Sequence, residues 1–225
     1  MTQLARTRTR TMIIAIDGPA GAGKSTVAKR LAAELGSSFL DTGAMYRAVA
    51  LAALEHDVDP MDGAACERIA RSLTLGFDRD GHILIDGRPG EPAIRAETVT
   101  KTVSAVAAHP GVRAAIVPLQ RAEALRQGGI VAEGRDMGTV VFPKADFKFF
   151  VTASPRERAR RRAAELGRPE RFAQILADIE LRDHLDSSRK DSPLTRASDA
   201  LLVETDGLDA TGVVHKILAH IRSHS

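Results

Sequence analysis

The sequence predicts a parallel α/β fold with three layers, and two patterns along the chain carry that prediction. Short apolar runs at residues 12–16, 130–132 and 147–152 are typical of strands that are covered on both faces. Helical patterns lie between such runs, for example at 24–35, where apolar residues recur every four positions. Strands that alternate with helices indicate a central parallel sheet between two helical layers.

The remaining elements of this core follow the same alternation. They are two strands and two helices, predicted at residues 38–40, 43–54, 201–204 and 210–222. Asp209 stands directly before the last helix and is a good N-cap. Pro118 lies inside an otherwise helical stretch at 110–127, and we expect a kink or break there, because proline cannot donate a backbone hydrogen bond.

Two regions interrupt the alternation. In the first, residues 73–77 and 82–85 form a predicted β-hairpin that turns at Asp80 and Gly81. We therefore expect a small α+β insertion at residues 41–105.

The second interruption is an arginine-rich arm at residues 154–172, which holds seven arginines against three glutamates. Ser154 and Glu157 fit a capping box, with a proline at the first helical position. Gly, Arg and Pro at 167–169 end this helix before another runs to about residue 189. The arm is thus predicted to be a basic helix–turn–helix.

The composition limits the class of protein. The chain of 225 residues is 44% hydrophobic and 27% charged, which suffices for a sizeable core and excludes wholesale disorder. Its longest apolar runs are far shorter than the roughly 20 residues that span a bilayer, and no secretion signal opens it. A single cysteine, Cys66, allows no internal disulfide, and no Cys/His spacing suggests zinc. We expect a cytoplasmic protein with no membrane partner.

The net charge of +3 is carried entirely by Arg6, Arg8 and Arg10, so residues 12–225 are balanced at zero. We expect residues 1–11 to form a disordered basic tail. A protein that wraps nucleic acid carries its surplus positive charge on the folded body. The charge distribution therefore argues against a nucleic-acid partner.

Residues 18–25 read GPAGAGKS and fit the P-loop pattern G-x-x-x-x-G-K-S, between a predicted strand and a predicted helix. Such a loop points successive backbone N–H groups at phosphate oxygens, and the helix N-terminus adds its positive dipole. Lys24 can reach the β- and γ-phosphates of a nucleoside triphosphate, and the Ser25 hydroxyl can ligate Mg²⁺. The residues expected to bind the triphosphate are Gly18, Pro19, Ala20, Gly21, Ala22, Gly23, Lys24, Ser25 and Thr26.

Residues 41–47 read DTGAMYR and begin the helix that follows the second predicted strand. Thr42 is the expected N-cap of this helix. Arg47 lies one turn further on and can grip a second anion, although an ordinary surface charge is the simpler interpretation.

Residues 133–139 read EGRDMGT and follow the predicted strand at 130–132. In an open α/β sheet, residues beyond the carboxyl ends of the strands line the ligand crevice. We therefore expect Arg135 and Asp136 in the same crevice as the P-loop. The structural alternative is a turn held by a local Arg135–Asp136 pair.

Arg182, Asp186 and Arg189 lie on one face of the helix after the arm, at spacings that permit Arg182–Asp186 and Asp186–Arg189 pairs. A solvated face with surface ion pairs is the simpler interpretation. Because the arginine-rich arm precedes this face, we favour a closing lid whose arginines at 160–162 move over the transferred phosphate.

Together these motifs resemble the bacterial cytidylate kinases. The resemblance covers residues 12–223 and is carried by the P-loop, DTGAMYR, EGRDMGTVVFP and RDHLDSSR. It implies a P-loop three-layer sandwich with an enlarged insertion that binds the nucleoside monophosphate and a helical lid. In the family, ATP with Mg²⁺ phosphorylates CMP or dCMP to the diphosphate. The implied divisions are a core at 12–40, 106–153 and 190–225, a CMP-binding insertion at 41–105, and a lid with its following helix at 154–189.

The resemblance also implies roles for single residues. Those at the CMP phosphate would be Thr42, Tyr46, Arg47, Arg135 and Arg189. Those facing cytosine would be Ser104, Arg113 and Asp136, and those holding the ribose would be Arg182 and Asp186. The charge on the transferred phosphoryl group would be bound by Lys24, Arg135, Arg161 and Arg162. No Asp directly ends an apolar strand, so we assign to the metal only Ser25, the substrate phosphates and water.

Three other functions stay open at this point. The nearest is a P-loop kinase for another nucleoside monophosphate or small metabolite, which a panel of acceptors would distinguish. A nucleotide-dependent switch is the second, although the sequence has no N-K-x-D-type guanine motif. A nucleic-acid-binding module is the third, and the balanced charge argues against it. No long exposed apolar stripe is evident, so we expect a monomer.

Overall fold

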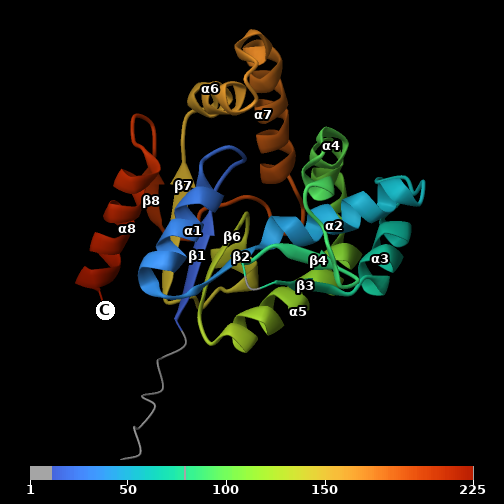
Figure 1. The fold of residues 1–225 in the computed structure, drawn as a ribbon, viewed down its shortest axis with the longest axis horizontal. Coiled ribbons are helices and arrows are strands. Elements are labelled where there is room, and N and C mark those ends of the chain that lie inside the picture. The colour runs from blue at the N-terminus through green and yellow to red at the C-terminus, as the bar shows by residue number, and fades with distance from the viewer. Residues whose placement is uncertain (1–11, 79, 225) are drawn as a thin grey trace, which may run out of the picture.

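A five-stranded parallel sheet forms the centre of the molecule (Figure 1). The computed structural model describes residues 12–78 and 80–224; the predicted basic tail lies outside this range. The strands stand in the order β2-β6-β1-β7-β8. Their bounds are Ile13–Asp17 for β1, Ser38–Asp41 for β2, Ile130–Gly134 for β6, Phe147–Thr152 for β7 and Leu201–Glu204 for β8.

Helices cover both faces of this sheet, which confirms the predicted three-layer α/β fold (Figure 1). On one face, α1 (Lys24–Leu35) and α8 (Ala210–Ser223) pack their apolar stripes against β1, β7 and β8. The other face is covered by α5 (Pro110–Gln127) and a π-helix at Met137–Val141. Asp209 caps α8 as predicted, since its side chain accepts a hydrogen bond from Gly212 N.

The insertion between β2 and α5 has a hydrophobic cluster of its own. Its helices are α2 (Thr42–Glu55), α3 (Gly63–Ser72) and α4 (Glu97–Val106), with a 3-10 turn at Ala93–Arg95. The predicted hairpin is present as β3 (Leu75–Phe77) and β4 (Ile83–Ile85), and a short third strand, β5 (Arg88–Pro89), pairs with β4.

The arginine-rich arm folds as the predicted pair of helices. Helix α6 (Pro155–Glu165) follows β7, a 3-10 turn occupies Pro169–Arg171, and α7 (Phe172–Ser187) returns toward the sheet (Figure 1). Ala159 and Ala163 of α6 pack against Ile175 and Ile179 of α7. Among the described residues, no helix is long and apolar enough to cross a membrane.

Two local predictions need correction. The first is wrong in part: we expected a kink or break at Pro118, and α5 continues through it without a break. Pro118 and Ala114 both lie on its exposed face, where water can bind the Ala114 carbonyl that loses its N–H partner. The second is the cap of α2: Asp41 accepts from Ala44 N and is the N-cap, whereas Thr42 is the first helical residue.

Candidate active site

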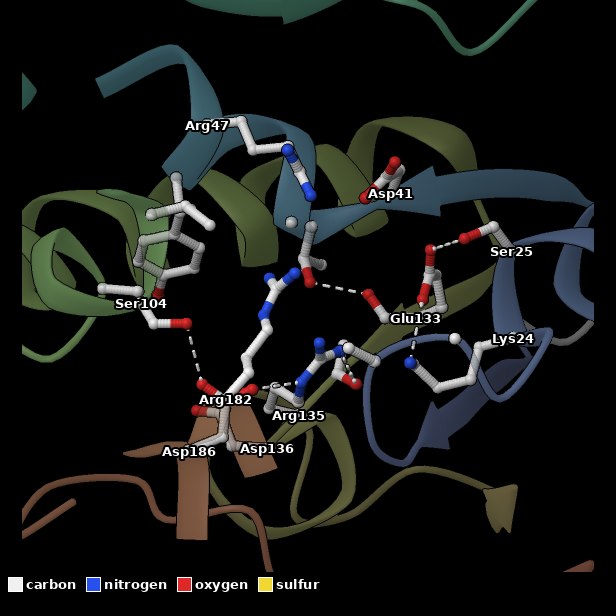
Figure 2. A pocket seen from close by; sticks show the side chains of 18 of the residues that line it. Lys24, Ser25, Asp41, Arg47, Ser104, Glu133, Arg135, Asp136, Arg182 and Asp186 are labelled. Atoms are coloured by element: carbon white, nitrogen blue, oxygen red, sulfur yellow. Dashed lines mark hydrogen bonds and ion pairs between the residues drawn. The ribbon is translucent and has the colours of Figure 1, made fainter. Parts of the chain in front are cut away.

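A cavity of about 180 Å³ opens where the P-loop, the start of α2, the loop after β6 and helix α7 meet. It collects the predicted acceptor residues, which come from five separate segments of the chain (Figure 2). Those residues are Thr42, Tyr46, Arg47, Ser104, Arg113, Arg135, Asp136, Arg182, Asp186 and Arg189. The predicted triphosphate residues on its wall are Ala20, Gly21, Lys24 and Ser25; the others, Gly18, Pro19, Ala22, Gly23 and Thr26, belong to the same loop and helix start.

The P-loop has the backbone shape that its glycines predict. Gly18 has φ 149°, and a Cβ there would lie 1.9 Å from the carbonyl oxygen of Val151. Gly23, with φ 85°, is the N-cap of α1. The loop therefore ends on a helix N-terminus beside the part of the cavity wall that Lys24 and Ser25 form.

Lys24 and Ser25 both face the carboxylate of Glu133 (Figure 2). The Lys24 Nζ lies 4.0 Å from Glu133 Oε2 and donates to the Pro19 carbonyl at 2.8 Å, and the Ser25 hydroxyl donates to Glu133 Oε1. Burial, followed by the nearby Arg135, lowers the pKa of Lys24 to about 7. Burial also raises the pKa of Glu133. In the site without ligand, the buried Lys24 is therefore only partly protonated near pH 7, and an anionic ligand would favour its charged form.

The sequence analysis gave no role to Glu133, which lines the cavity, or to Asp17, which holds the loop beside it. Strand β1 ends at Asp17, so the statement that no Asp directly ends an apolar strand is wrong. Strand β6 runs on through Glu133 to Gly134, two residues beyond the apolar run from which its end was predicted. An acidic residue directly after an apolar run was the available signal in both cases.

Asp17 holds the loop that follows β6. Its two carboxylate oxygens accept from Met137 N and Gly138 N, each at 2.7 Å. Burial raises the pKa of Asp17 to about 6. The carboxylate joins the strand before the P-loop to the loop that carries Arg135 and Asp136, so it fixes one motif relative to the other.

Asp136 pairs with Arg113 of α5 on the cavity wall, and both side chains are buried. Arg113 also donates from Nε to Ser192 Oγ at 2.9 Å. Burial raises the pKa of Asp136. The local Arg135–Asp136 pair considered as an alternative is not formed, because each residue has a distant partner. The wall thus presents a carboxylate that accepts hydrogen bonds beside a guanidinium that donates them.

Asp186 is the centre of a second cluster (Figure 2). It accepts from Arg135 Nε at 2.8 Å and from Ser104 Oγ at 3.2 Å, and it pairs with Arg189. The Asp186 side chain is only 1% exposed, so this face of α7 is not solvated. Of the two pairs that the spacing permits, Asp186–Arg189 is formed, whereas the described part of the chain gives no hydrogen bond between Arg182 and Asp186.

Arg182 and Arg189 each keep a buried Nε without a hydrogen-bond partner among the described residues. Burial, followed by Arg135, lowers the pKa of Arg182 to about 9. Donors of this kind need an acceptor that the protein itself does not supply. The cavity is therefore built to receive an oxygen-rich ligand.

The start of α2 forms the opposite wall. Thr42 Oγ1 donates to the Glu133 carbonyl at 2.6 Å, and Arg47 donates to Ile94 O at 3.2 Å and Thr100 Oγ1 at 2.8 Å. Arg95 also lines the cavity, paired at 2.7 Å with Asp41, and the sequence analysis missed it.

The predicted lid arginines lie off the wall of this cavity. Arg161 donates to Glu157 at 2.8 Å and to the Thr205 carbonyl at 2.6 Å, and Arg162 pairs with Glu165 at 3.1 Å. Arg161 is nevertheless close to the P-loop, since a Cβ at Gly23 would lie 4.0 Å from its Nη1. Arg161 and Arg162 are thus held by partners outside the cavity.

The fold and the cavity define a class: a P-loop enzyme that binds a nucleoside triphosphate beside a second anionic ligand. Arginine and lysine side chains outnumber carboxylates on the wall, as binding of two phosphorylated ligands requires. The family model for cytidylate kinase matches residues 14–223. The chain belongs to the cytidylate kinase family, and it is a phosphotransferase.

Individual relatives agree with this assignment. The chain is 45% identical over 217 residues to the cytidylate kinase of Mycobacterium leprae, covering 95% of this chain and 97% of that protein. It is also 47% identical over 223 residues to a bifunctional pantoate ligase/cytidylate kinase of Synechococcus. This match covers 95% of this chain but only 46% of that protein. A solved structure of an uncharacterized protein from Eubacterium ventriosum shares the fold, with TM-score 0.54, 16% identity, and 95% and 99% of the two chains covered.

Proposed function

We propose that the protein transfers the γ-phosphoryl group of ATP to CMP and dCMP, giving ADP with CDP or dCDP. The observation that carries this proposal is that the P-loop lysine and the Arg113–Asp136 pair line the same cavity. The Asp186 cluster lines the same cavity. A donor triphosphate and an acceptor nucleotide can therefore lie end to end.

On the donor side, the P-loop backbone binds the triphosphate and Lys24 reaches its β- and γ-phosphates. Mg²⁺ fits beside it, since the Ser25 hydroxyl and the Glu133 carboxylate are hard oxygen donors already in contact with each other. When bound there, the ion would neutralise charge on the phosphates. Ser25 and Glu133 would hold it together with phosphate oxygens and water.

On the acceptor side, the residues divide by chemistry. Arg47, Arg135 and Arg189 would bind the CMP phosphate, with Thr42 and Tyr46 beside it. Arg182 and Asp186 would hold the ribose. Ser104, Arg113 and Asp136 would face the base, where the carboxylate accepts from the N4 amino group of cytosine and the guanidinium donates to its N3 and O2 atoms.

For this reaction the protein must position the two substrates and neutralise negative charge. It needs no general base, because a phosphate oxygen of CMP is already anionic. That oxygen forms a bond to the γ-phosphorus while the bond from the γ-phosphorus to the β–γ bridging oxygen breaks, and ADP leaves with the electron pair. Lys24 and Arg135 would bind the charge that spreads over the transferred group.

Arg161 and Arg162 would join this machinery when the arm at 154–189 closes over the insertion at 41–105 and the core. Closure that waits for both substrates would keep water from the γ-phosphate. We likewise propose a cytoplasmic monomer that binds neither nucleic acid nor membrane, in line with the balanced charge of residues 12–225.

A panel of acceptors tests the proposal. ADP formation from ATP and Mg²⁺ is measured with CMP, dCMP, UMP, AMP or shikimate, and without any acceptor. We expect turnover with CMP and dCMP and very little with the others. Turnover that is highest with AMP or shikimate, or that needs no acceptor, would overturn it.

A further inference from the structure

Gln120 is a fully buried amide with no hydrogen-bond partner among the described residues. Both its Oε1 and its Nε2 are unpaired, and so is the hydroxyl of Tyr46, a residue of the cavity wall. Buried polar groups are nearly always paired, because an unpaired one costs free energy. Unpaired polar atoms on two buried side chains therefore need an explanation.

The two side chains are neighbours. Burial raises the pKa of Tyr46 to about 12. A side-chain interaction with the Gln120 amide acts in the opposite direction, and such an interaction requires the amide to lie next to the phenol. Packing agrees with this placement, since Tyr46 shares a hydrophobic cluster with Ile116, which belongs to the same buried face of α5 as Gln120. A glutamine can donate to or accept from a phenol, so either orientation of the amide suits this partner.

Helix α5 meets Tyr46 at two points. Arg113 and Gln120 are seven residues apart, two helical turns, and both belong to the buried face of α5. The Arg113 guanidinium carbon lies 5.5 Å from the centroid of the Tyr46 ring, while Gln120 faces its hydroxyl. The same arginine pairs with Asp136, so the position of Tyr46 bears directly on the pair that faces the base.

Packing alone does not account for a glutamine at this position. The other buried side chains on this part of the helix, Ile116 and Ala124, are apolar. Gln120 is also not among the residues that line the cavity, so we expect no direct contact with a bound nucleotide. Gln120 can therefore affect acceptor binding only by positioning a residue that lines the cavity.

We propose that Gln120 is a positioning residue for acceptor selection: its amide hydrogen-bonds to the Tyr46 hydroxyl when the acceptor binds. This bond holds the Tyr46 ring against Arg113 and thereby fixes the Arg113–Asp136 pair. The inference rests on the proposed function, since it assigns to that pair the choice of base.

The test compares Gln120→Met, which keeps the length of the side chain and removes its hydrogen bonds, with Tyr46→Phe, which removes only the hydroxyl. Each variant should raise the KM for CMP more than it lowers kcat. Each should also reduce the CMP/UMP ratio of kcat/KM by about tenfold, the worth of one hydrogen bond. The double variant should be no worse than either single one, because both remove the same interaction. Gln127→Met, at the far end of α5, is the matched control and should leave both parameters unchanged.

A spectroscopic measurement keeps the test independent of turnover. Tyr46 is the only tyrosine in the chain, so a carbon label at its Cζ gives one NMR signal. That signal should shift when CMP is added to the wild type, and most of the shift should be lost in Gln120→Met. Effects of Gln120→Met and Tyr46→Phe that add, or an unchanged KM and NMR shift in Gln120→Met, would overturn the inference. If the wild type itself does not prefer CMP, the proposed function fails instead.

Discussion

The side chains of Lys24 and Glu133 depend on each other for their charge. Burial lowers the pKa of Lys24 and raises that of Glu133, and only 4.0 Å separates Lys24 Nζ from Glu133 Oε2. A triphosphate that enters the P-loop adds negative charge beside the lysine and favours its protonated form.

Lys24→Ala should reduce phosphoryl transfer at least about a hundredfold, because a charge that stabilises the transferred phosphoryl group is worth roughly 3 kcal/mol or more. Steady-state ADP formation with CMP measures the loss, and circular dichroism shows whether the variant is folded. Nearly unchanged turnover in a folded variant would show that the P-loop is not the active site.

Binding of metal-free ATP should take up a proton near pH 8. The pKa of Lys24 is about 7 in the free protein, so the amine is mostly neutral at that pH, and the bound phosphates raise its pKa. Near pH 6 the amine is already charged, and the uptake should be small. Calorimetry in buffers of different ionisation enthalpy, with a chelator present, counts the protons. Equal uptake at both pH values would contradict this assignment.

Asp136→Ala should narrow the gap between CMP and UMP, mainly by harming CMP. The carboxylate can accept from the N4 amino group of cytosine but cannot pair with the O4 acceptor of uracil. The ratio of kcat/KM for the two acceptors, measured on the wild type and the variant, gives the result. An unchanged ratio would remove Asp136 from base recognition and leave the phosphotransferase assignment intact.

Among the elements, those with a regular apolar pattern could be predicted from the sequence. The bounds of α1, β7 and β8 agree with their patterns because each has a face in the core cluster. The apolar run alone did not show that β6 continues through Glu133, and the acidic residue directly after the run, which was the available signal, was not used. They also carried no signal for Arg95, which a 3-10 turn of the insertion brings to the cavity. The unbroken helix at Pro118 could not be predicted either, because it depends on which face of α5 packs against the core and which is exposed to water.

The arm is the element whose position should change during turnover. Arg161 is held by Glu157 and Thr205, and Arg162 by Glu165, so both must leave these partners to reach a phosphoryl group. Replacing both with Ala should lower kcat more than the affinity for CMP, because their contacts with substrate form in the closed state.

Single-turnover kinetics and CMP titration separate the two effects of the Arg161/Arg162 double variant. Arg168→Ala, which removes one charge from the same arm outside the helices, serves as the control and should change neither. Unchanged kinetics accompanied by weaker RNA binding would favour a nucleic-acid surface over a lid.

At the scale of the whole molecule, the core and the insertion bury separate apolar clusters, and α5 contributes to both. Its first half, with Val112 and Ile116, packs in the cluster of the insertion, whereas Ala124 belongs to the cluster under the central sheet. Arg113 lies in that first half and Asp136 in the loop after β6. The Arg113–Asp136 pair therefore links the half of α5 that packs against the insertion to the loop after β6. If this pair faces the base, as we propose, the choice of base depends on how the insertion and the core pack together.

The measurement that tests this account most directly is kcat/KM for CMP and for UMP, determined side by side on the wild-type protein with saturating ATP and Mg²⁺. Uracil presents an acceptor and a donor where cytosine presents a donor and an acceptor, so UMP would leave the hydrogen bonds that Asp136 and Arg113 offer to the base unmatched. Each unpaired buried group costs about 1–3 kcal/mol, which predicts that CMP is preferred by roughly a hundredfold or more. Equal use of UMP and CMP would contradict the account.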